Sequence, residues 1–167
     1  MKLCGIELAH PIVNASGTFD AIAARRAFGD ALLRRFPFAA FVSKTVTLEP
    51  RQGNPPPRLW ESPAGLINSI GLPNKGLDGF LREELDADPA ATVYACGPPP
   101  MLEAVRALCA ERDVPAQLAM ESGMACGFGA CFGCVVPTRN GYVRLCVDGP
   151  VVDASELETA LVSGSGH

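Results

Sequence analysis

The sequence predicts an α/β protein with two strand–helix–strand stretches and a small β-rich module that carries most of its cysteines. Residues 6–43 and 92–120 each alternate short apolar runs with a segment of helical periodicity, the order of a parallel βα unit. Four of the seven cysteines then fall between residues 126 and 146. Seventeen glycines and fifteen prolines in 167 residues indicate short elements joined by many turns.

Charge and hydropathy argue against several function classes. The net charge is −4 and the 14 basic residues form no run, which argues against nucleic-acid binding because phosphate neutralisation drives that affinity. No apolar run is long enough to span a bilayer, and the first residues do not lead into the apolar core of a signal peptide. We therefore expect no membrane partner and a cytoplasmic location. An odd number of clustered cysteines also fits a reducing compartment better than a disulfide framework.

The first strand–helix–strand stretch ends in a candidate site residue. Residues 6–17 predict a strand pair or an extended segment, residues 20–36 a helix that ends before Pro37, and residues 39–43 a buried strand. Lys44 follows that strand directly. Functional groups gather at the carboxyl ends of parallel strands, so Lys44 is a candidate, although a solvated lysine fits the position equally well.

The middle of the chain predicts a loop, a turn, a helix and a junction. Residues 49–58 contain four prolines and predict an irregular surface loop. A short apolar segment at 64–74 turns through Gly71, and Asn74 caps a helix that runs to about Leu85. The acidic residues of 83–91 then predict a junction between two parts of the chain.

The second half predicts short, regular elements. We expect a strand at 92–96, a turn at 97–100, a helix at 101–112 and a strand at 117–120. Residues 135–137 and 141–145 predict a hairpin with Asn140–Gly141 as its tight turn. The stretch from Asp153 to Glu156 reads as a capping box that starts a short helix, and residues 163–167 predict a disordered end.

The cysteine-rich window carries the strongest chemical signal. Its spacing, C-x4-C-x2-C-x11-C, is typical of a plant-type [2Fe-2S] cluster, with glycines that leave room for inorganic sulfide and for backbone N–H donors. A structural zinc site is an alternative, but closed zinc sites usually pair two short knuckles; unligated buried thiols are another. The spacing favours a [2Fe-2S] cluster, whose ligands would be Cys126, Cys131, Cys134 and Cys146.

Three motifs in the first half resemble one enzyme family. Asn14–Thr18, Ser43–Thr45 and Asn68–Asn74 are similar to the N-terminal part of the catalytic subunit of class B, NAD-dependent dihydroorotate dehydrogenase, over residues 1–82. The resemblance implies a partial TIM-barrel-like βα segment. It also implies FMN contacts at Ser16, Gly17, Lys44 and Thr45, and contacts to orotate or dihydroorotate at Lys44, Asn68, Ser69, Ile70, Gly71 and Leu72.

The same resemblance limits the chemistry expected of the chain. A complete barrel takes about 250 residues, so residues 1–82 supply roughly a third of one. The family's catalytic Cys base has no counterpart here, and Cys4 does not match it. We assign no catalytic residue and expect no oxidation of dihydroorotate by this chain alone.

Residues 88–160 resemble the C-terminal part of the electron-transfer subunit of the same enzyme. The turn from Cys96 to Met101 is similar to that of ferredoxin-reductase-like NAD(P)H-binding domains, where it lies beside the nicotinamide. It also fits a structural strand-to-helix turn, with Cys96 and Cys109 as core thiols. The flavin signature of the FAD barrel is not found, so we do not expect FAD to bind.

Together, these observations predict five regions and one leading function. The regions are a barrel-like segment (1–82), a junction (83–91), a reductase-like strand–helix–strand (92–121), a [2Fe-2S] cluster-binding module (122–160) and a tail (161–167). The leading function is an iron–sulfur electron-transfer component of dihydroorotate dehydrogenase in pyrimidine biosynthesis, relaying electrons between flavins with the enzyme's catalytic or electron-transfer subunits as partners. The alternative is a non-catalytic fusion or truncated fragment with a structural metal site.

Overall fold

The computed structural model describes residues 1–3, 6–87 and 90–162 and divides into two compact units. Unit 1 comprises Met1–Val46 and Arg51–Asn74, and unit 2 comprises Thr47–Pro50 and Lys75–His167. The chain therefore passes between the units three times. Within the described ranges, no helix is long and apolar enough to cross a membrane.

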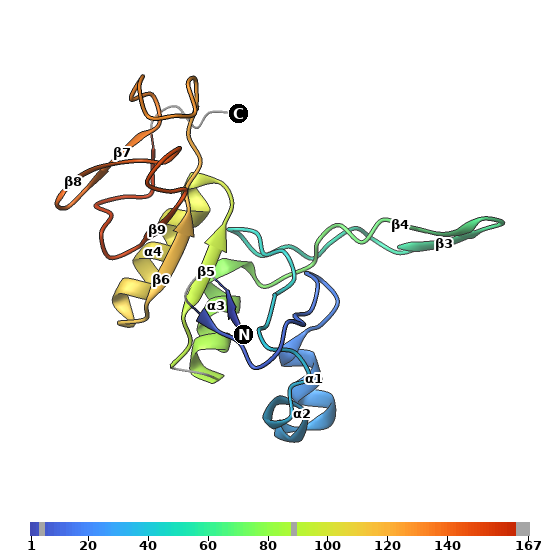
Figure 1. Ribbon diagram of the computed structural model, residues 1–167. Helices are drawn as coiled ribbons and strands as arrows, with labels where there is room; N and C mark the ends of the chain where they lie inside the picture. The colour runs from blue at the N-terminus through green and yellow to red at the C-terminus, as the bar shows by residue number, and fades with distance from the viewer. Residues whose placement is uncertain (4–5, 88–89, 163–167) are drawn as a thin grey trace. The chain divides into compact units, whose positions relative to one another are not determined.

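Unit 1 contains two hairpins and a pair of helices (Figure 1). In both hairpins, β1–β2 and β3–β4, the strands run antiparallel. The loop predicted at 49–58 leads directly into β3. The sequence did not predict the β3–β4 hairpin that follows it. The bounds are β1 Lys2–Leu3, β2 Ile6–Glu7, α1 Ala21–Phe28, α2 Asp30–Arg34, β3 Leu59–Ser62 and β4 Gly65–Asn68.

The helix predicted over 20–36 forms as two pieces. Asp20 caps α1 by accepting a hydrogen bond from the N–H of Ala23. Gly29 then adopts φ 66°, and its N–H donates to the carbonyl of Arg25, which ends the helix. This left-handed conformation suits glycine and interrupts the helical repeat, so α2 starts in a new direction.

The strand predicted at 39–43 does not form. The segment runs beside residues 12–16 in the same direction: the N–H of Ala39 donates to the carbonyl of Ile12, and Ser16 lies against Ser43. Between these contacts the amide of Asn14 exchanges two hydrogen bonds of 2.7 Å with the backbone of Val42. Because a buried side-chain amide replaces the strand-to-strand ladder, two extended segments lie parallel without forming a sheet.

Aromatic rings provide the main packing of unit 1. Phe36 contacts Phe19, Phe38 and Phe41, with ring centroids 5.2–6.2 Å apart. Among the residues whose burial is described, Asn14 is the only fully buried one in this unit, whereas every fully buried apolar side chain belongs to unit 2. Unit 1 therefore has little core of its own.

Unit 2 is built on a three-stranded sheet in the order β5-β6-β9. β5 and β6 run parallel and are joined by α4, and β9 pairs antiparallel with β6. The elements predicted at 92–96, 101–112 and 117–120 are confirmed to within two residues. The bounds are α3 Gly76–Ala87, β5 Val93–Cys96, α4 Pro99–Glu111, β6 Ala116–Ala119, β7 Val135–Thr138, β8 Gly141–Arg144 and β9 Val151–Asp153.

The core of unit 2 lies between α4 and this sheet. α4 buries Leu102, Val105, Leu108 and Cys109, and Leu118 on the central strand is fully buried. Burial raises the pKa of the Cys109 thiol, as expected of a core cysteine. Cys96 was also predicted to be a core thiol, but it is exposed, because alternate residues of the edge strand β5 face solvent.

A short strap from the first half of the chain belongs to unit 2. The carbonyl of Leu48 accepts a hydrogen bond from the N–H of Leu77 at the start of α3. Gly76 has φ 76°, and a β-carbon there would lie 2.9 Å from the nitrogen of Pro50. The strap, residues 47–50, therefore packs closely against the N-terminus of α3.

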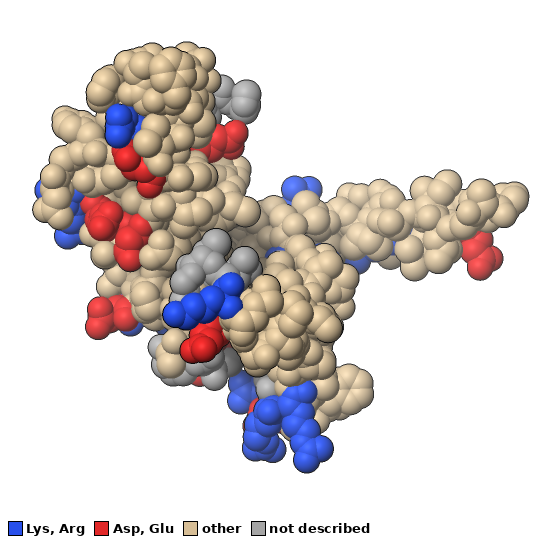
Figure 2. Space-filling view, viewed as in Figure 1, with Lys and Arg blue, Asp and Glu red and all other residues tan. Residues whose placement is uncertain are grey.

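The two units differ in charge. Unit 1 carries eight Lys and Arg against four Asp and Glu, and unit 2 carries six against fourteen. Figure 2 shows basic side chains gathered over α1 and α2, where Arg25, Arg26, Arg34 and Arg35 are exposed. The net charge of −4 is therefore the sum of a basic unit 1 and an acidic unit 2.

The helix predicted from Asp153 is replaced by a turn. Asp153 ends β9 opposite Gln117, whose amide donates to its carboxylate. The Asp153 carboxylate also accepts hydrogen bonds from the N–H and the hydroxyl of Ser155. Asp153, which was predicted to cap a helix, is therefore engaged in the pairing of β9 with β6. Residues 163–167, predicted to be disordered, lie outside the described residues.

Glu103 fastens the end of the described chain to α4. Its carboxylate forms a salt bridge with Arg106 and accepts hydrogen bonds from the hydroxyl of Thr159 and the N–H of Ala160. Arg106 first, and then the partners at 159 and 160, hold the pKa of Glu103 at about 2 despite partial burial. We call this set of contacts the Glu103 clasp.

We predict that Glu103→Gln lowers the free energy of unfolding of unit 2 by about 1–3 kcal/mol at pH 7, because a carboxylate with several donors is lost. Since the pKa is lowered by folding, the stabilisation is present above the ordinary glutamate pKa and disappears as the pH falls towards 2. Chemical denaturation between pH 7 and pH 2.5 measures it. Glu111→Gln, on the same helix, is the control, and equal losses in both variants would contradict the clasp.

Candidate metal centre

The cysteine loop leaves and re-enters the sheet of unit 2 at neighbouring strands. β6 leads into the loop and β9 follows it, and the N–H of Met120 donates to the carbonyl of Pro150 across the two ends. The predicted hairpin inside the loop is confirmed as β7–β8, with Thr138 opposite Gly141. Its two-residue turn is 139–140, one position earlier than predicted. The loop is thus closed at its base and stiffened in its middle.

The four predicted ligands come together as two pairs. The sulfur of Cys126 accepts a hydrogen bond from the N–H of Cys131 at 3.5 Å and also interacts with the Cys131 thiol. The sulfurs of Cys134 and Cys146 lie 3.3 Å apart, and the N–H of Leu145 donates to the carbonyl of Cys134 across the base of the hairpin. A two-iron cluster takes two thiolates at each iron, which is the arrangement that two pairs offer.

No single-ion site competes with this arrangement in the part of the chain that the structure describes. There, no three His, Cys, Asp or Glu side chains gather closely enough to hold one metal ion. A closed zinc site needs four ligands around one point. In the described residues the loop sulfurs therefore lie as pairs and not as four ligands around one point.

Backbone donors favour the ionised form of Cys126. The N–H groups of Cys131 and Phe128, together with the Cys131 thiol, lower the pKa of Cys126 to about 6. At neutral pH this cysteine is therefore mostly thiolate, the form that binds iron. The N–H of Gly133 similarly approaches the sulfur of Cys131 at 3.4 Å.

The two thiols of the second pair shift each other's pKa. The pKa of Cys134 is lowered, first by the backbone N–H of Cys146 and then by its thiol. The pKa of Cys146 is raised, first by the hydrogen bond between the two thiols and then by burial, and the charges of Cys134 and Cys126 add to this effect. The two pairs are therefore close enough to act on each other electrostatically.

The loop glycines leave space that other residues would fill. Gly129 has φ 82°, and a β-carbon there would lie 2.8 Å from a methyl of Val147. A β-carbon at Gly133 would lie 3.5 Å from the sulfur of Cys131. Gly127 also has a positive φ, 72°, but open space around it. Left-handed backbone is therefore found at Gly127 and Gly129 and close approach at Gly129, whereas Gly133 has neither, because a β-carbon there would make only ordinary van der Waals contact.

The loop also carries one ion pair and a set of exposed apolar side chains, which we call the apolar rim, and neither was expected from the sequence. Arg144 forms a salt bridge with Asp148, and its N–H donates to the same carboxylate, which fixes the turn that carries Cys146. The side chains of the rim are large and exposed; they are Met124, Phe128, Phe132, Tyr142 and Val147. Aromatic residues placed between loop glycines, outside any helical or strand period, are the signal that could have revealed them.

The predicted FMN residues lie in unit 1, and one hydrogen bond links their two motifs. The hydroxyl of Ser16 donates to the carbonyl of Ser43 at 2.8 Å, so the turn with Gly17 lies beside the segment that continues into Lys44 and Thr45. Asn14 joins the same two segments at Val42, one residue before Ser43. The structure therefore brings together the two motifs assigned to FMN.

Five of the six predicted pyrimidine residues, Asn68–Leu72, lie at the end of β4 and directly after it; the sixth is Lys44. Asn54 donates to the carbonyl and hydroxyl of Ser69, and its own N–H donates to the carbonyl of Ile70. Gly71 has φ 78°, and a β-carbon there would lie 2.6 Å from the nitrogen of Asn54. These contacts shape the segment 68–72 against the proline-rich loop, and none of them joins it to Ser16 or Lys44 among the bonds of the described residues.

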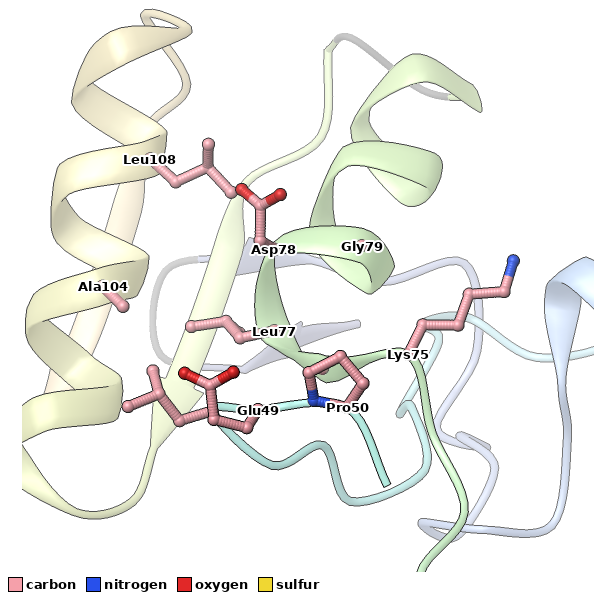
Figure 3. A pocket seen from close by; sticks show the side chains of 10 residues that line it. Glu49, Pro50, Lys75, Leu77, Asp78, Gly79, Ala104 and Leu108 are labelled. Atoms are coloured by element: carbon pink, nitrogen blue, oxygen red, sulfur yellow. The ribbon is translucent and has the colours of Figure 1, made fainter. Parts of the chain in front are cut away.

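Unit 2 also has a hollow of about 430 Å³ between the strap, α3 and α4 (Figure 3). Leu77 and Leu108 line it, and Lys75 points away from the other lining side chains. Lys75 forms a salt bridge with Glu83 and Asp78 forms one with Arg82. We assign no ligand to this hollow.

Two family models match the chain. One describes dihydroorotate dehydrogenase and matches residues 1–97, more than half of the chain. The other describes the iron-sulfur cluster binding domain of dihydroorotate dehydrogenase B and matches residues 121–158. The resemblance to both subunits is therefore confirmed, as are the iron–sulfur interpretation of the cysteine loop and, more coarsely, a mixed α/β fold. The individual ligand, flavin and substrate residues stay predictions.

Relatives of both subunit types match parts of the chain. The catalytic subunit of dihydroorotate dehydrogenase B from Thermoanaerobacter sp. (strain X514) is 39% identical over 102 residues, 58% of this chain and 32% of the relative. The electron transfer subunit from Clostridium perfringens (strain 13 / Type A) is 42% identical over 83 residues, 50% of this chain and 34% of the relative. The chain thus spans about a third of the length of each.

One solved structure also overlaps the chain. It is an NADH-dependent reduced ferredoxin-NADP oxidoreductase, described for flavin-based electron bifurcation. The match covers 51% of this chain and 31% of that chain, with 26% sequence identity and a TM-score of 0.45.

We predict that Cys131→Ser removes the visible absorbance of anaerobically reconstituted protein and lowers its iron and sulfide content to background, because one ligand of the first pair is lost. It should also lower the thermal stability of unit 2. Cys96→Ser is the matched control, since that cysteine is exposed and outside the loop. Full visible absorbance in Cys131→Ser would refute the ligand assignment.

Proposed function

Because the chain belongs to the dihydroorotate dehydrogenase family, we propose that its cysteine loop holds a [2Fe-2S] cluster and passes electrons between flavins of a class B dihydroorotate dehydrogenase system. The observation that carries the proposal is the convergence of Cys126 with Cys131 and of Cys134 with Cys146 in one closed loop. When bound, the cluster would accept and donate one electron at a time. Flavins can also exchange single electrons, so the two groups are compatible.

The residues of the loop would set the properties of this centre. N–H groups directed at sulfur, such as those of Cys131 and Gly133, stabilise negative charge and so favour the reduced form. Cys131 is exposed while Cys134 is buried, so a redox partner would approach from the Cys131 side. The apolar rim around the loop supplies contact surface there.

Unit 1 would contribute flavin contacts. We assign FMN to the side of unit 1 where Ser16 and Gly17 meet the segment that carries Lys44 and Thr45, because a direct hydrogen bond joins these two motifs. The segment Asn68–Leu72, with Lys44, would face the pyrimidine. The parallel course of residues 12–16 and 39–43 supports an incomplete TIM-barrel-like unit, although its strands are not formed here.

Other subunits would supply the rest of the reaction. The chain spans about a third of each relative, and the FMN residues and the cysteine loop lie in different units. We infer that the catalytic and electron transfer subunits of dihydroorotate dehydrogenase B are the natural class of partner. In this scheme the chain relays electrons and does not itself abstract a proton from dihydroorotate.

The first test is an anaerobic reconstitution with iron and sulfide, followed by quantification of iron, sulfide, zinc and flavin in one sample. The proposal expects about two irons and two sulfides per chain and a one-electron reduced state detectable by electron paramagnetic resonance after dithionite. A colourless protein that takes up zinc would leave only a structural metal role. Stoichiometric cluster that cannot be reduced would also overturn the electron-transfer proposal.

A separate prediction concerns the binding of FMN to unit 1. We expect titration of the chain with FMN to quench flavin fluorescence, and Lys44→Ala to weaken that binding by at least about tenfold, the loss of one charged contact. Lys2→Ala, in the same unit, is the control. Equal binding by Lys44→Ala and the unmodified chain would remove Lys44 from the proposed site and leave the cluster assignment untouched.

A further inference from the structure

Arg144 lies at the end of β8, where the hairpin of the cysteine loop returns towards Cys146. It pairs across the hairpin with Val135, the residue that follows Cys134. Its carbonyl accepts a hydrogen bond of 2.7 Å from the N–H of Asp148, which closes the turn that carries Cys146. The backbone of Arg144 is therefore anchored next to both cysteines of the second pair.

A forked ion pair fixes the direction of the Arg144 side chain. The backbone N–H and Nε both donate to Oδ2 of Asp148, at 3.0 and 3.1 Å, and Nη2 donates to Oδ1 at 3.4 Å. Contact through two nitrogens holds the plane of the guanidinium as well as its position. The third nitrogen, Nη1, is directed at Gly129, where a β-carbon would lie 3.1 Å from Nη1 and 3.5 Å from Cζ.

The contact with Gly129 brings the guanidinium to the other half of the loop. Gly129 lies between Cys126 and Cys131 in the chain, and its N–H is directed at the sulfur of Cys146. Because Gly129 has no side chain, the guanidinium of Arg144 lies directly against this part of the backbone. One positive charge thus sits where the segments that carry the two cysteine pairs meet.

Few other positive charges belong to this module. Residues 122–160 contain four acidic side chains and two basic ones, Arg139 and Arg144. The pKa of Arg144 is raised first by the hydrogen bond and charge of Asp148, and then by the charges of Cys146 and Cys134. The guanidinium is therefore within electrostatic reach of the sulfurs as well as of its carboxylate partner.

We propose that Arg144, fixed by Asp148 against Gly129, raises the reduction potential of the centre in the cysteine loop, and that Asp148 offsets part of this effect. The inference rests on the proposed function, since it concerns the same centre. Reduction adds one negative charge to an iron–sulfur cluster. A fixed positive charge nearby stabilises that added charge, and a negative one opposes it.

A role limited to bracing the turn makes a different prediction. If the ion pair only holds the turn, loss of either partner should disturb the centre in the same way. An electrostatic role predicts opposite effects, because Arg144 and Asp148 carry opposite charges. Replacing each residue in turn with a neutral side chain of similar size therefore separates the two roles.

The test is a redox titration of the full chain after anaerobic reconstitution with iron and sulfide, followed by visible absorbance and electron paramagnetic resonance. We expect Arg144→Gln to lower the ratio of reduced to oxidised cluster at a fixed potential by about tenfold, which is about 59 mV for one electron. We expect Asp148→Asn to raise this ratio by at least about threefold. The asparagine amide can still accept from the N–H of Arg144, so the turn is retained.

Arg139→Gln is the matched control, because it removes the same charge from the turn at the other end of the same hairpin. The four residue pairs of that hairpin span about 14 Å, more than the screening length of about 8–10 Å in physiological salt. The ratio should therefore stay within about twofold of that of the unmodified chain. Arg144→Lys keeps the charge without the fork and should retain most of the potential. With Asp148→Asn, it keeps the test decisive should Arg144→Gln fail to hold the cluster.

Three results would overturn the inference alone. They are equal potentials in all variants, shifts in the same direction for the neutral replacements of Arg144 and Asp148, and a shift in Arg139→Gln as large as in Arg144→Gln. In each case a reducible cluster is present, so the proposed function stands. An unmodified chain that holds no reducible cluster would instead overturn the proposed function, and this inference with it.

Discussion

The packing of α4 against the β5-β6-β9 sheet is the contact on which the candidate metal centre depends. It buries Leu102, Val105 and Leu118, which are among the largest fully buried side chains of the described residues. The cysteine loop begins at the end of β6 and returns at β9, so the sheet fixes both ends of the loop side by side. The Glu103 clasp fastens the following segment to the same helix. The loop adds buried side chains of its own, Val136 and Leu145, to this framework.

Unit 1 is held in another way. Its segments are joined by polar side-chain contacts, such as those of Asn14 with Val42 and of Ser16 with Ser43, and by aromatic edge contacts around Phe36. Net gains from single hydrogen bonds are small compared with burial of a full core. Residues proposed to bind FMN therefore rest on a framework that a bound flavin or a partner would reinforce, whereas the cysteine loop rests on a framework that is complete within its own unit.

The sequence predicted what depends on local spacing and missed what depends on competition between neighbours. The cysteine pattern, the β7–β8 hairpin and the elements around α4 follow from residues close in sequence. The strand at 39–43 failed because the Asn14 amide occupies the positions of ladder bonds, and the capping box at Asp153 failed because Gln117 pairs with that residue. The β3–β4 hairpin was not predicted because its turn, Pro63–Ala64, lacks the Asn-Gly signal typical of tight hairpin turns. The pairing of the four loop sulfurs could not be predicted, because it depends on the three-dimensional course of the loop and not on the spacing of the cysteines.

The strap at residues 47–50 bears on how such a chain can be cut or recombined. Its four residues come from the middle of the first half of the sequence, yet they pack on the N-terminus of α3. No single breakpoint separates the two units as complete cassettes, because a cut after Asn74 leaves the strap on the wrong piece. A gene fragment that encodes only Lys75 onward would therefore express a unit that lacks the cover of its first helical turn.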